Sequence, residues 1–139
     1  MRTSSLLPVL LALAGPPSAF ARSAPYDGHW TVTLACPPQA GEDDAKGYVR
    51  RFPADVVNGQ LRAEYGTRGE PGWHVLTGPI AANGNATLHL EGVVSEPRQA
   101  ARYATRGRVY KYRVRAHFEP AAGSGKRLGG RACEFSFAR

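Results

Sequence analysis

A regular alternation of polar and apolar residues near the start of the chain limits what it can fold into. In the stretch from residue 30 to residue 36 every second side chain is apolar: Trp30, Val32, Leu34 and Cys36. A period of two is typical of a β-strand with one face buried in a core. The same alternation is clearest between residues 109 and 118, so the chain is expected to be built from strands.

Further segments with strand character follow at short intervals and are separated by turn residues. The Asn58-Gly59 pair is a strong hairpin signal. We expect an all-β fold, a small antiparallel up-and-down barrel of seven or eight strands. The expected strands are 31–36, 48–57, 60–66, 73–80, 86–94, 109–118 and 131–139, with a further short one at 126–128 after a turn over 119–125.

The second expected strand breaks the alternation at one residue. Arg50 has the same parity as Tyr48 and Phe52, which would place its charge inside the barrel. A buried charge without a partner is costly, so an interior arginine would need a carboxylate or a bound anion. A bulge at Pro53 that shifts the register is the simpler interpretation, and the interior Arg50 is the alternative.

The first 21 residues predict a secretory signal peptide. An apolar run from Leu6 to Ala14 follows Arg2 and is too short to span a membrane. A small-x-small site ends at Ala21, where we expect cleavage. Residues 22–139 then form a single barrel domain that is secreted or periplasmic, and no transmembrane segment is expected.

The two cysteines lie near opposite ends of the exported part. Cys36 and Cys133 are predicted to form a disulfide, because paired cysteines are the simplest state in an oxidising compartment. If the first and last strands run antiparallel beside this bridge, Leu34 lies opposite Phe135 and Trp30 lies opposite Arg139. Only a closed or nearly closed sheet brings the terminal strands together in this way.

Gly28 and Trp30 at the first strand, with Arg139 opposite, predict a structural plug at one end of the barrel. This arrangement resembles the signature of the calycin group, which includes lipocalins, avidins and related small barrels. In length the exported part is similar to avidins and to small periplasmic inhibitors of bacterial metalloproteases. The resemblance implies an up-and-down barrel in which a basic residue of the last strand packs over the first-strand tryptophan.

Positive charge is concentrated in the second half of the chain. The full chain carries 18 basic and 11 acidic residues, a formal net charge of +7. Such a surface attracts an acidic protein or another anionic envelope component, whereas an exported protein rarely meets nucleic acid. The residues expected to contact a partner come from the loop 95–108 and the next strand: Arg98, Arg102, Arg106, Arg108, Lys111, Arg113 and Arg115.

Inward-facing aromatic residues support a second hypothesis, a carrier of a small apolar or aromatic ligand inside the barrel. The side chains expected to line such a site are Tyr65, Trp73, Tyr110, Tyr112 and Phe135. The alternative is that these residues only fill the core, as in most small barrels.

The sequence contains no recognisable catalytic or metal-binding motif. Its four histidines have neither HxxxH nor HExxH spacing, and no Gly-x-Ser-x-Gly elbow is present. The segment from Gly123 to Arg127 has glycines and a lysine but follows a turn between strands, so it is not a phosphate loop. We therefore expect a non-enzymatic binding protein without metal or cofactor. Inhibition of an envelope or extracellular hydrolase is one form that such binding would take.

Overall fold

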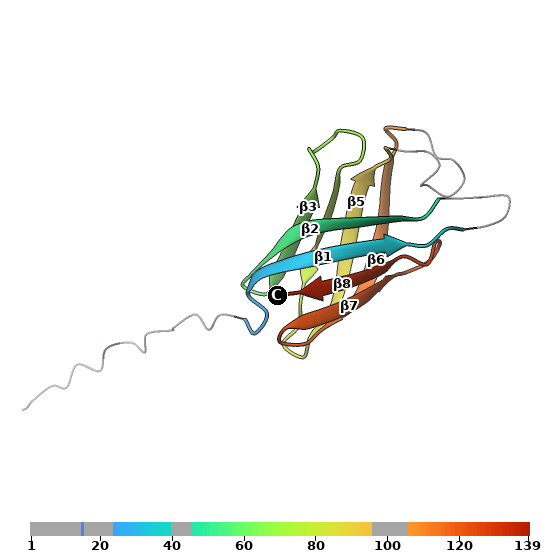
Figure 1. Cartoon of the computed structure of the whole chain (residues 1–139). Coiled ribbons are helices and arrows are strands. Elements are labelled where there is room, and N and C mark those ends of the chain that lie inside the picture. The colour runs from blue at the N-terminus through green and yellow to red at the C-terminus, as the bar shows by residue number, and fades with distance from the viewer. Residues whose placement is uncertain (1–14, 16–23, 40–45, 96–105) are drawn as a thin grey trace, which may run out of the picture.

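The computed structural model describes residue 15 and residues 24–39, 46–95 and 106–139. Eight strands follow one another and close into a barrel in which each strand is antiparallel to its neighbours (Figure 1). They are β1 (Gly28–Cys36), β2 (Tyr48–Val57), β3 (Gln60–Tyr65), β4 (His74–Pro79), β5 (Asn85–Val93), β6 (Val109–Phe118), β7 (Ala122–Arg127) and β8 (Glu134–Ala138). The predicted all-β up-and-down barrel is confirmed.

The predicted signal peptide, residues 1–21, lies outside the described residues except for Gly15. It therefore stays a prediction, as does cleavage after Ala21. Within the described part of the chain, no helix has the length and apolar character needed to cross a membrane.

The barrel closes where β1 meets β8. Leu34 lies opposite Phe135 and Val32 opposite Phe137, as predicted from the sequence. The sulfur atoms of Cys36 and Cys133 are 2.08 Å apart, so the predicted disulfide is confirmed at the end of this seam. Residues 97 positions apart are thereby held together, which restricts the unfolded chain far more than the folded one.

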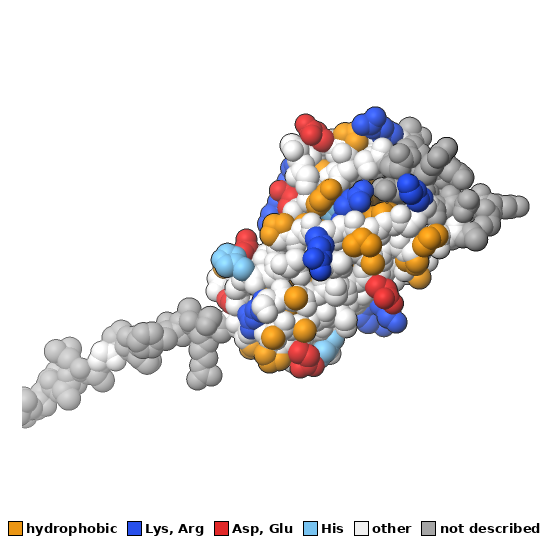
Figure 2. Space-filling model, in the orientation of Figure 1, with side chains coloured by type: hydrophobic (Ala, Val, Ile, Leu, Met, Phe, Trp, Pro, Cys, Tyr) orange, Lys and Arg blue, Asp and Glu red, His pale blue; other side chains and the backbone are white. Residues whose placement is uncertain are grey.

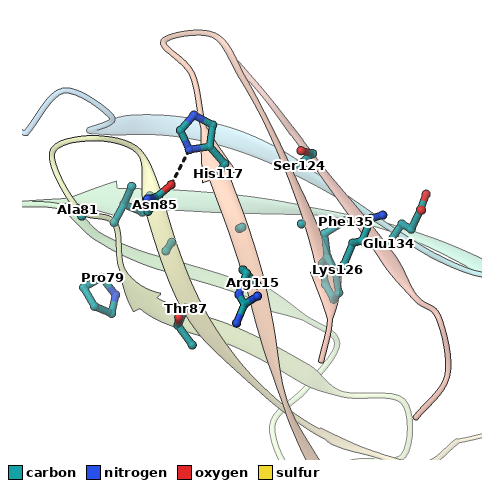
Figure 3. A pocket seen from close by; sticks show the side chains of 14 residues that line it. Pro79, Ala81, Asn85, Thr87, Arg115, His117, Ser124, Lys126, Glu134 and Phe135 are labelled. Atoms are coloured by element: carbon teal, nitrogen blue, oxygen red, sulfur yellow. Dashed lines mark hydrogen bonds between the residues drawn. The ribbon is translucent and has the colours of Figure 1, made fainter. Parts of the chain in front are cut away.

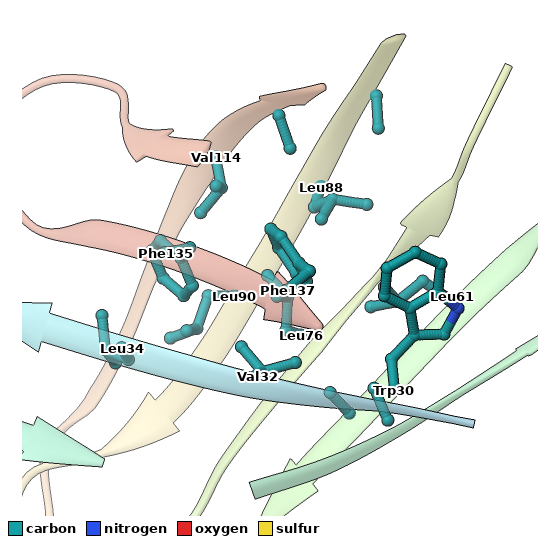
Figure 4. Packing of buried hydrophobic residues seen from close by; sticks show 14 of the residues in the cluster. Trp30, Val32, Leu34, Leu61, Leu76, Leu88, Leu90, Val114, Phe135 and Phe137 are labelled. Atoms are coloured by element: carbon teal, nitrogen blue, oxygen red, sulfur yellow. The ribbon is translucent and has the colours of Figure 1, made fainter. Parts of the chain in front are cut away.

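The interior of the barrel is filled by one continuous group of apolar side chains (Figure 4). Alternate residues of β1, β5 and β8 point inward and meet there, and each is almost completely removed from solvent. Burying one large apolar side chain contributes about 1.5–3 kcal/mol. The fully buried members with the largest volumes include Phe118, Phe137, Leu34, Leu61, Leu76, Leu88 and Leu90.

A contact between the C-terminal residue and the first strand plugs one end of the barrel. The guanidinium carbon of Arg139 lies 4.6 Å from the centre of the Trp30 ring. Arg139 also donates hydrogen bonds to the carbonyl groups of Asp27, Pro25 and Pro120. Figure 1 shows the C-terminus beside the start of β1. The structure thus brings the residues of the predicted plug together.

The expected bulge in β2 is absent, and the alternative for Arg50 is the correct one. The β1–β2 ladder runs without interruption from Gly28 opposite Val56 to Cys36 opposite Tyr48. Arg50 therefore faces the interior. Pro53 is compatible with a regular strand because the β2–β3 ladder begins only at Ala54. The missing N–H of Pro53 therefore removes no hydrogen bond from that ladder.

The turn expected over 119–125 is shorter than predicted, because β7 begins at Ala122. Gly123 and Gly125 belong to the strand and face inward, where there is no room for a side chain. A Cβ atom at Gly125 would lie 3.1 Å from side-chain carbons of Ala116 and Val114. The glycines of this segment were interpreted as turn residues, but they are needed because the strand packs closely against other side chains inside the barrel.

We predict that Gly125→Val lowers the free energy of unfolding by about 1–3 kcal/mol, because the added methyl groups overfill the interior. Ser124→Val is the matched control, since Ser124 is the next residue of β7 and is exposed. We expect the control to change stability by less than about 0.5 kcal/mol. Urea unfolding measures both, and equal stability of the two variants would show that Gly125 does not face the core.

Candidate functional site

The outer wall of the barrel carries part of the predicted partner-binding set. We use "outer wall" for the outward side chains of β5 to β8. Lys111, Arg113 and Arg115 all stand exposed on this wall along β6. Arg106 and Arg108 are exposed just before β6. Arg98 and Arg102, also predicted to contact a partner, lie outside the described residues.

A hollow of about 950 Å³ lies on the outer wall, with Arg115 and Lys126 among its lining residues (Figure 3). Arg115 of β6 lies directly opposite Lys126 of β7, with Thr87 of β5 on its other side. Like charges placed directly opposite each other destabilise a sheet. Neither cation forms an ion pair with any residue that the structure describes. The carboxylate nearest to this pair in the sheet is that of Glu134, which also lines the hollow and lies opposite Lys126 on β8.

Polar groups complete the lining of this hollow. His117 is held at both ring nitrogens, 2.8 Å from the Asn85 side-chain oxygen and 2.9 Å from a Glu119 carboxylate oxygen. The hydroxyl groups of Thr87 and Ser124 come from strands on either side of β6. The hollow therefore combines two cations and one carboxylate, that of Glu134, with neutral groups able to donate and accept hydrogen bonds.

Positive charge is not continuous over the face of the molecule shown in Figure 2. On the face shown in Figure 2, lysine and arginine side chains are interspersed with acidic and hydrophobic ones. The Arg115–Lys126 pair is thus distinguished by two directly opposed cations within a hollow whose described lining contains one carboxylate, Glu134.

A cluster of polar side chains, separate from the hollow on the outer wall, occupies the interior at the end of the barrel opposite the plug. We call it the arginine–tyrosine end; its members are Tyr48, Arg50, Tyr65, His74, Tyr110, Tyr112, Arg127 and Arg131. Guanidinium groups and aromatic rings alternate within it. Tyr48 has Arg50 and Arg131 each 5.3 Å from its ring centre, and Arg127 lies 4.2 Å from that of Tyr112.

Connections at the disulfide side help to position this end. Arg131, two residues before Cys133, donates hydrogen bonds to the carbonyl groups of Pro37 and Lys46. Cys36 lies opposite Tyr48 across β1 and β2. The disulfide thus sits beside the first tyrosine of the group and ties it to the segment that carries Arg131.

His74 is the most deeply buried member, with 3% of its surface exposed. Its ring stacks on Tyr65 at 5.0 Å and meets the edge of Phe52 at 4.7 Å. Burial, and secondarily the charge of Arg50, lower the pKa of His74 to about 4. The imidazole is therefore neutral at pH 7, and its Nε2 atom is buried without a hydrogen-bond partner among the described residues.

Three tyrosines of this end are held in their protonated form. Burial raises the pKa values of Tyr48, Tyr110 and Tyr112 above the ordinary range, although nearby arginines act in the opposite direction. Gly92 makes room for the ring of Tyr110, since a Cβ atom at Gly92 would lie 2.5 Å from two of its atoms. These hydroxyl groups consequently remain hydrogen-bond donors at neutral pH.

The residues predicted to line an interior ligand site are not all brought together. Tyr65, Tyr110, Tyr112 and Phe135 face the interior. Trp73 instead packs with Val75 and Val93 in a separate cluster and donates a hydrogen bond to Glu64. It precedes the inward-facing His74, so its side chain falls on the outer face.

The sequence prediction did not include several members of the arginine–tyrosine end. Tyr48, His74, Arg127 and Arg131 were not predicted as site residues. The parity of Arg50 was the available signal, because an inward arginine marks a polar interior. Once that register is accepted, Tyr48 follows as its inward neighbour on the same strand.

Among the described residues no three His, Cys, Asp or Glu side chains are grouped so that they could hold a metal ion. Comparison with known proteins gives no relative for this chain. No protein-family model, no curated protein and no solved structure matches it.

We predict that His74 makes the protein less stable in mild acid. Its pKa is about 4 when folded and about 6.5 when unfolded, so the unfolded chain binds the additional proton between these values. Stability then rises with pH through this window. Between pH 7 and pH 5 the loss from this group is about 2 kcal/mol.

Urea unfolding of the wild type and of His74→Phe at both pH values measures this contribution. The variant keeps an aromatic ring beside Tyr65 but cannot titrate, so it should lose about 2 kcal/mol less than the wild type. His89→Phe, at an exposed histidine of β5, should behave like the wild type. Identical acid sensitivity of all three proteins would contradict the assignment.

Proposed function

We propose that this chain is an exported, non-enzymatic binding protein that holds an anionic partner against its outer wall. The observation that carries the proposal is the exposed pair Arg115 and Lys126, directly opposite each other on β6 and β7. Glu134 lies on the other side of Lys126, and neither cation forms an ion pair among the described residues. A partner carboxylate between them would relieve their repulsion. Lys111 and Arg113 extend the same positive row along β6.

The partner class that fits this wall is an acidic protein or another anionic component of the cell envelope. Positive charge on a rigid sheet steers an acidic partner and sets its orientation. Inhibition of an envelope or extracellular hydrolase is one form of this function. Export rests on the signal-peptide prediction, and the calycin resemblance is supported by the eight-stranded barrel and by the Trp30–Arg139 contact.

A carrier of a small apolar or aromatic ligand is the second candidate. Its support is the set of half-buried aromatic residues at the arginine–tyrosine end: Tyr65, Tyr110 and Tyr112. The remainder of the interior is occupied by the apolar side chains of the core. A carried ligand would therefore be confined to the polar end of the barrel.

We predict that removing the opposed pair weakens binding of an acidic polypeptide. The double variant Arg115→Ala, Lys126→Ala should raise the Kd for poly-L-glutamate about tenfold, the effect of losing about 1.4 kcal/mol of contact energy. Isothermal titration calorimetry at fixed salt concentration measures the change. The experiment uses the purified protein with its disulfide intact.

The matched control is Arg51→Ala, Arg62→Ala, which removes two exposed arginines from the outward faces of β2 and β3. Net charge falls equally in both double variants, so a general attraction would weaken both to the same extent. We expect less than about a twofold change in the control. Equal weakening in the two variants would overturn the outer wall as the binding surface.

A further inference from the structure

The arginine–tyrosine end contains a set of polar groups that the protein itself does not satisfy. The Nε atom of Arg127 and the Nε2 atom of His74 are buried and have no hydrogen-bond partner in the described structure. Four partly buried tyrosines, Tyr48, Tyr65, Tyr110 and Tyr112, surround these atoms and contribute their hydroxyl groups to the same end.

Two buried polar atoms without a partner at one end of the barrel need a physical explanation. Buried polar atoms in folded proteins are nearly always hydrogen-bonded, and exceptions often indicate a site for an ion or ligand. Two of the three such atoms among the described residues belong to the arginine–tyrosine end, the third being the side-chain oxygen of Gln39, whereas the rest of the interior is apolar. Their concentration indicates a common partner.

The chemistry of these groups specifies what that partner is. The raised pKa values of Tyr48, Tyr110 and Tyr112 keep these hydroxyl groups protonated, and the Arg127 guanidinium can only donate. Arg127 forms no ion pair with any described residue; its guanidinium stacks on Tyr112 and also approaches Gly130. An acceptor-rich, negatively charged group matches such a set of donors, and an apolar ligand does not.

Arg127 and Tyr112 face the interior, but both residues also border the outer wall. Together they help to line a second hollow of the outer wall, about 620 Å³ in volume, beside Lys111 and Arg113. Among the described residues that line it, Glu91 is the only carboxylate, and it lies opposite Lys111 on the neighbouring strand. The balance of charge around Arg127 is therefore positive.

We propose that the arginine–tyrosine end binds a small oxyanion, a carboxylate or phosphate group, through the guanidinium of Arg127 and the neighbouring tyrosine hydroxyls. This site is separate from the Arg115–Lys126 pair, so the inference does not depend on the proposed function. Phe135 packs against Tyr112 with ring centres 6.5 Å apart, which provides an apolar surface beside the donors. A carboxylate attached to an aromatic ring would contact both kinds of group.

The test is an NMR titration of the purified chain with sodium benzoate and, separately, with inorganic phosphate, each matched in ionic strength with sodium chloride. We expect the Arg127 Nε–H resonance and the tyrosine ring resonances to shift with at least one oxyanion and not with chloride. A response to benzoate alone identifies an aromatic carboxylate, a response to phosphate alone identifies a phosphate group, and either supports the proposal. Shifts with neither, or equal shifts with chloride, would overturn it.

Variants then locate the binding. Arg127→Met, which keeps an unbranched side chain beside Tyr112, should weaken oxyanion binding at least about tenfold. The double variant Arg115→Ala, Lys126→Ala should leave oxyanion binding unchanged. This expectation holds whether the wild type binds poly-L-glutamate at the outer wall or not. If Arg127→Met does not fold, the wild-type Arg127 resonance still decides the question. Oxyanion binding that is unaffected in a folded Arg127→Met would contradict the site.

Discussion

The uninterrupted pairing of β1 with both β2 and β8 is the constraint on which the rest of the structure depends. Because side chains alternate along a strand, fixing the register of β1 decides which residues of its two neighbours face inward. Phe135 and Phe137 enter the core for this reason, and so does Arg50. A shift of one residue at this seam would exchange the inner and outer faces of the strands concerned.

This register divides the interior into two chemically different regions. Between the plug made by Trp30 and Arg139 and the middle of the barrel, the inward residues are aliphatic or aromatic and fully packed. Beyond Phe52, the inward positions of β2 are Arg50 and Tyr48, and arginine and tyrosine prevail at that end. The disulfide, which joins β1 to the segment before β8, lies beside the polar region. The apolar region provides stability, whereas the polar region leaves donors available.

The fold could be predicted largely from local patterns, but the two candidate sites could not. Alternation, the Asn58-Gly59 turn and the two cysteines were sufficient for the barrel and for the β1–β8 register. The extent of β7 was missed because a glycine that makes room for Val114 looks in sequence like a glycine that makes a turn. The Arg115–Lys126 opposition depends on the register between β6 and β7. The arginine–tyrosine end likewise requires residues from five strands and from the loop before β8 to converge, which no local pattern encodes.

The measurement that tests the central claim most directly is the set of cross-strand nuclear Overhauser effects at the seam of the barrel. With β1 paired antiparallel to β8, backbone protons of Val32 and Phe137, and of Leu34 and Phe135, lie close enough for strong cross-peaks. Those cross-peaks should appear together with the ones that join Leu34 to Arg50 across β1 and β2. Cross-peaks displaced by one residue along either ladder, or their absence between β1 and β8, would contradict the closed barrel and the inward position of Arg50.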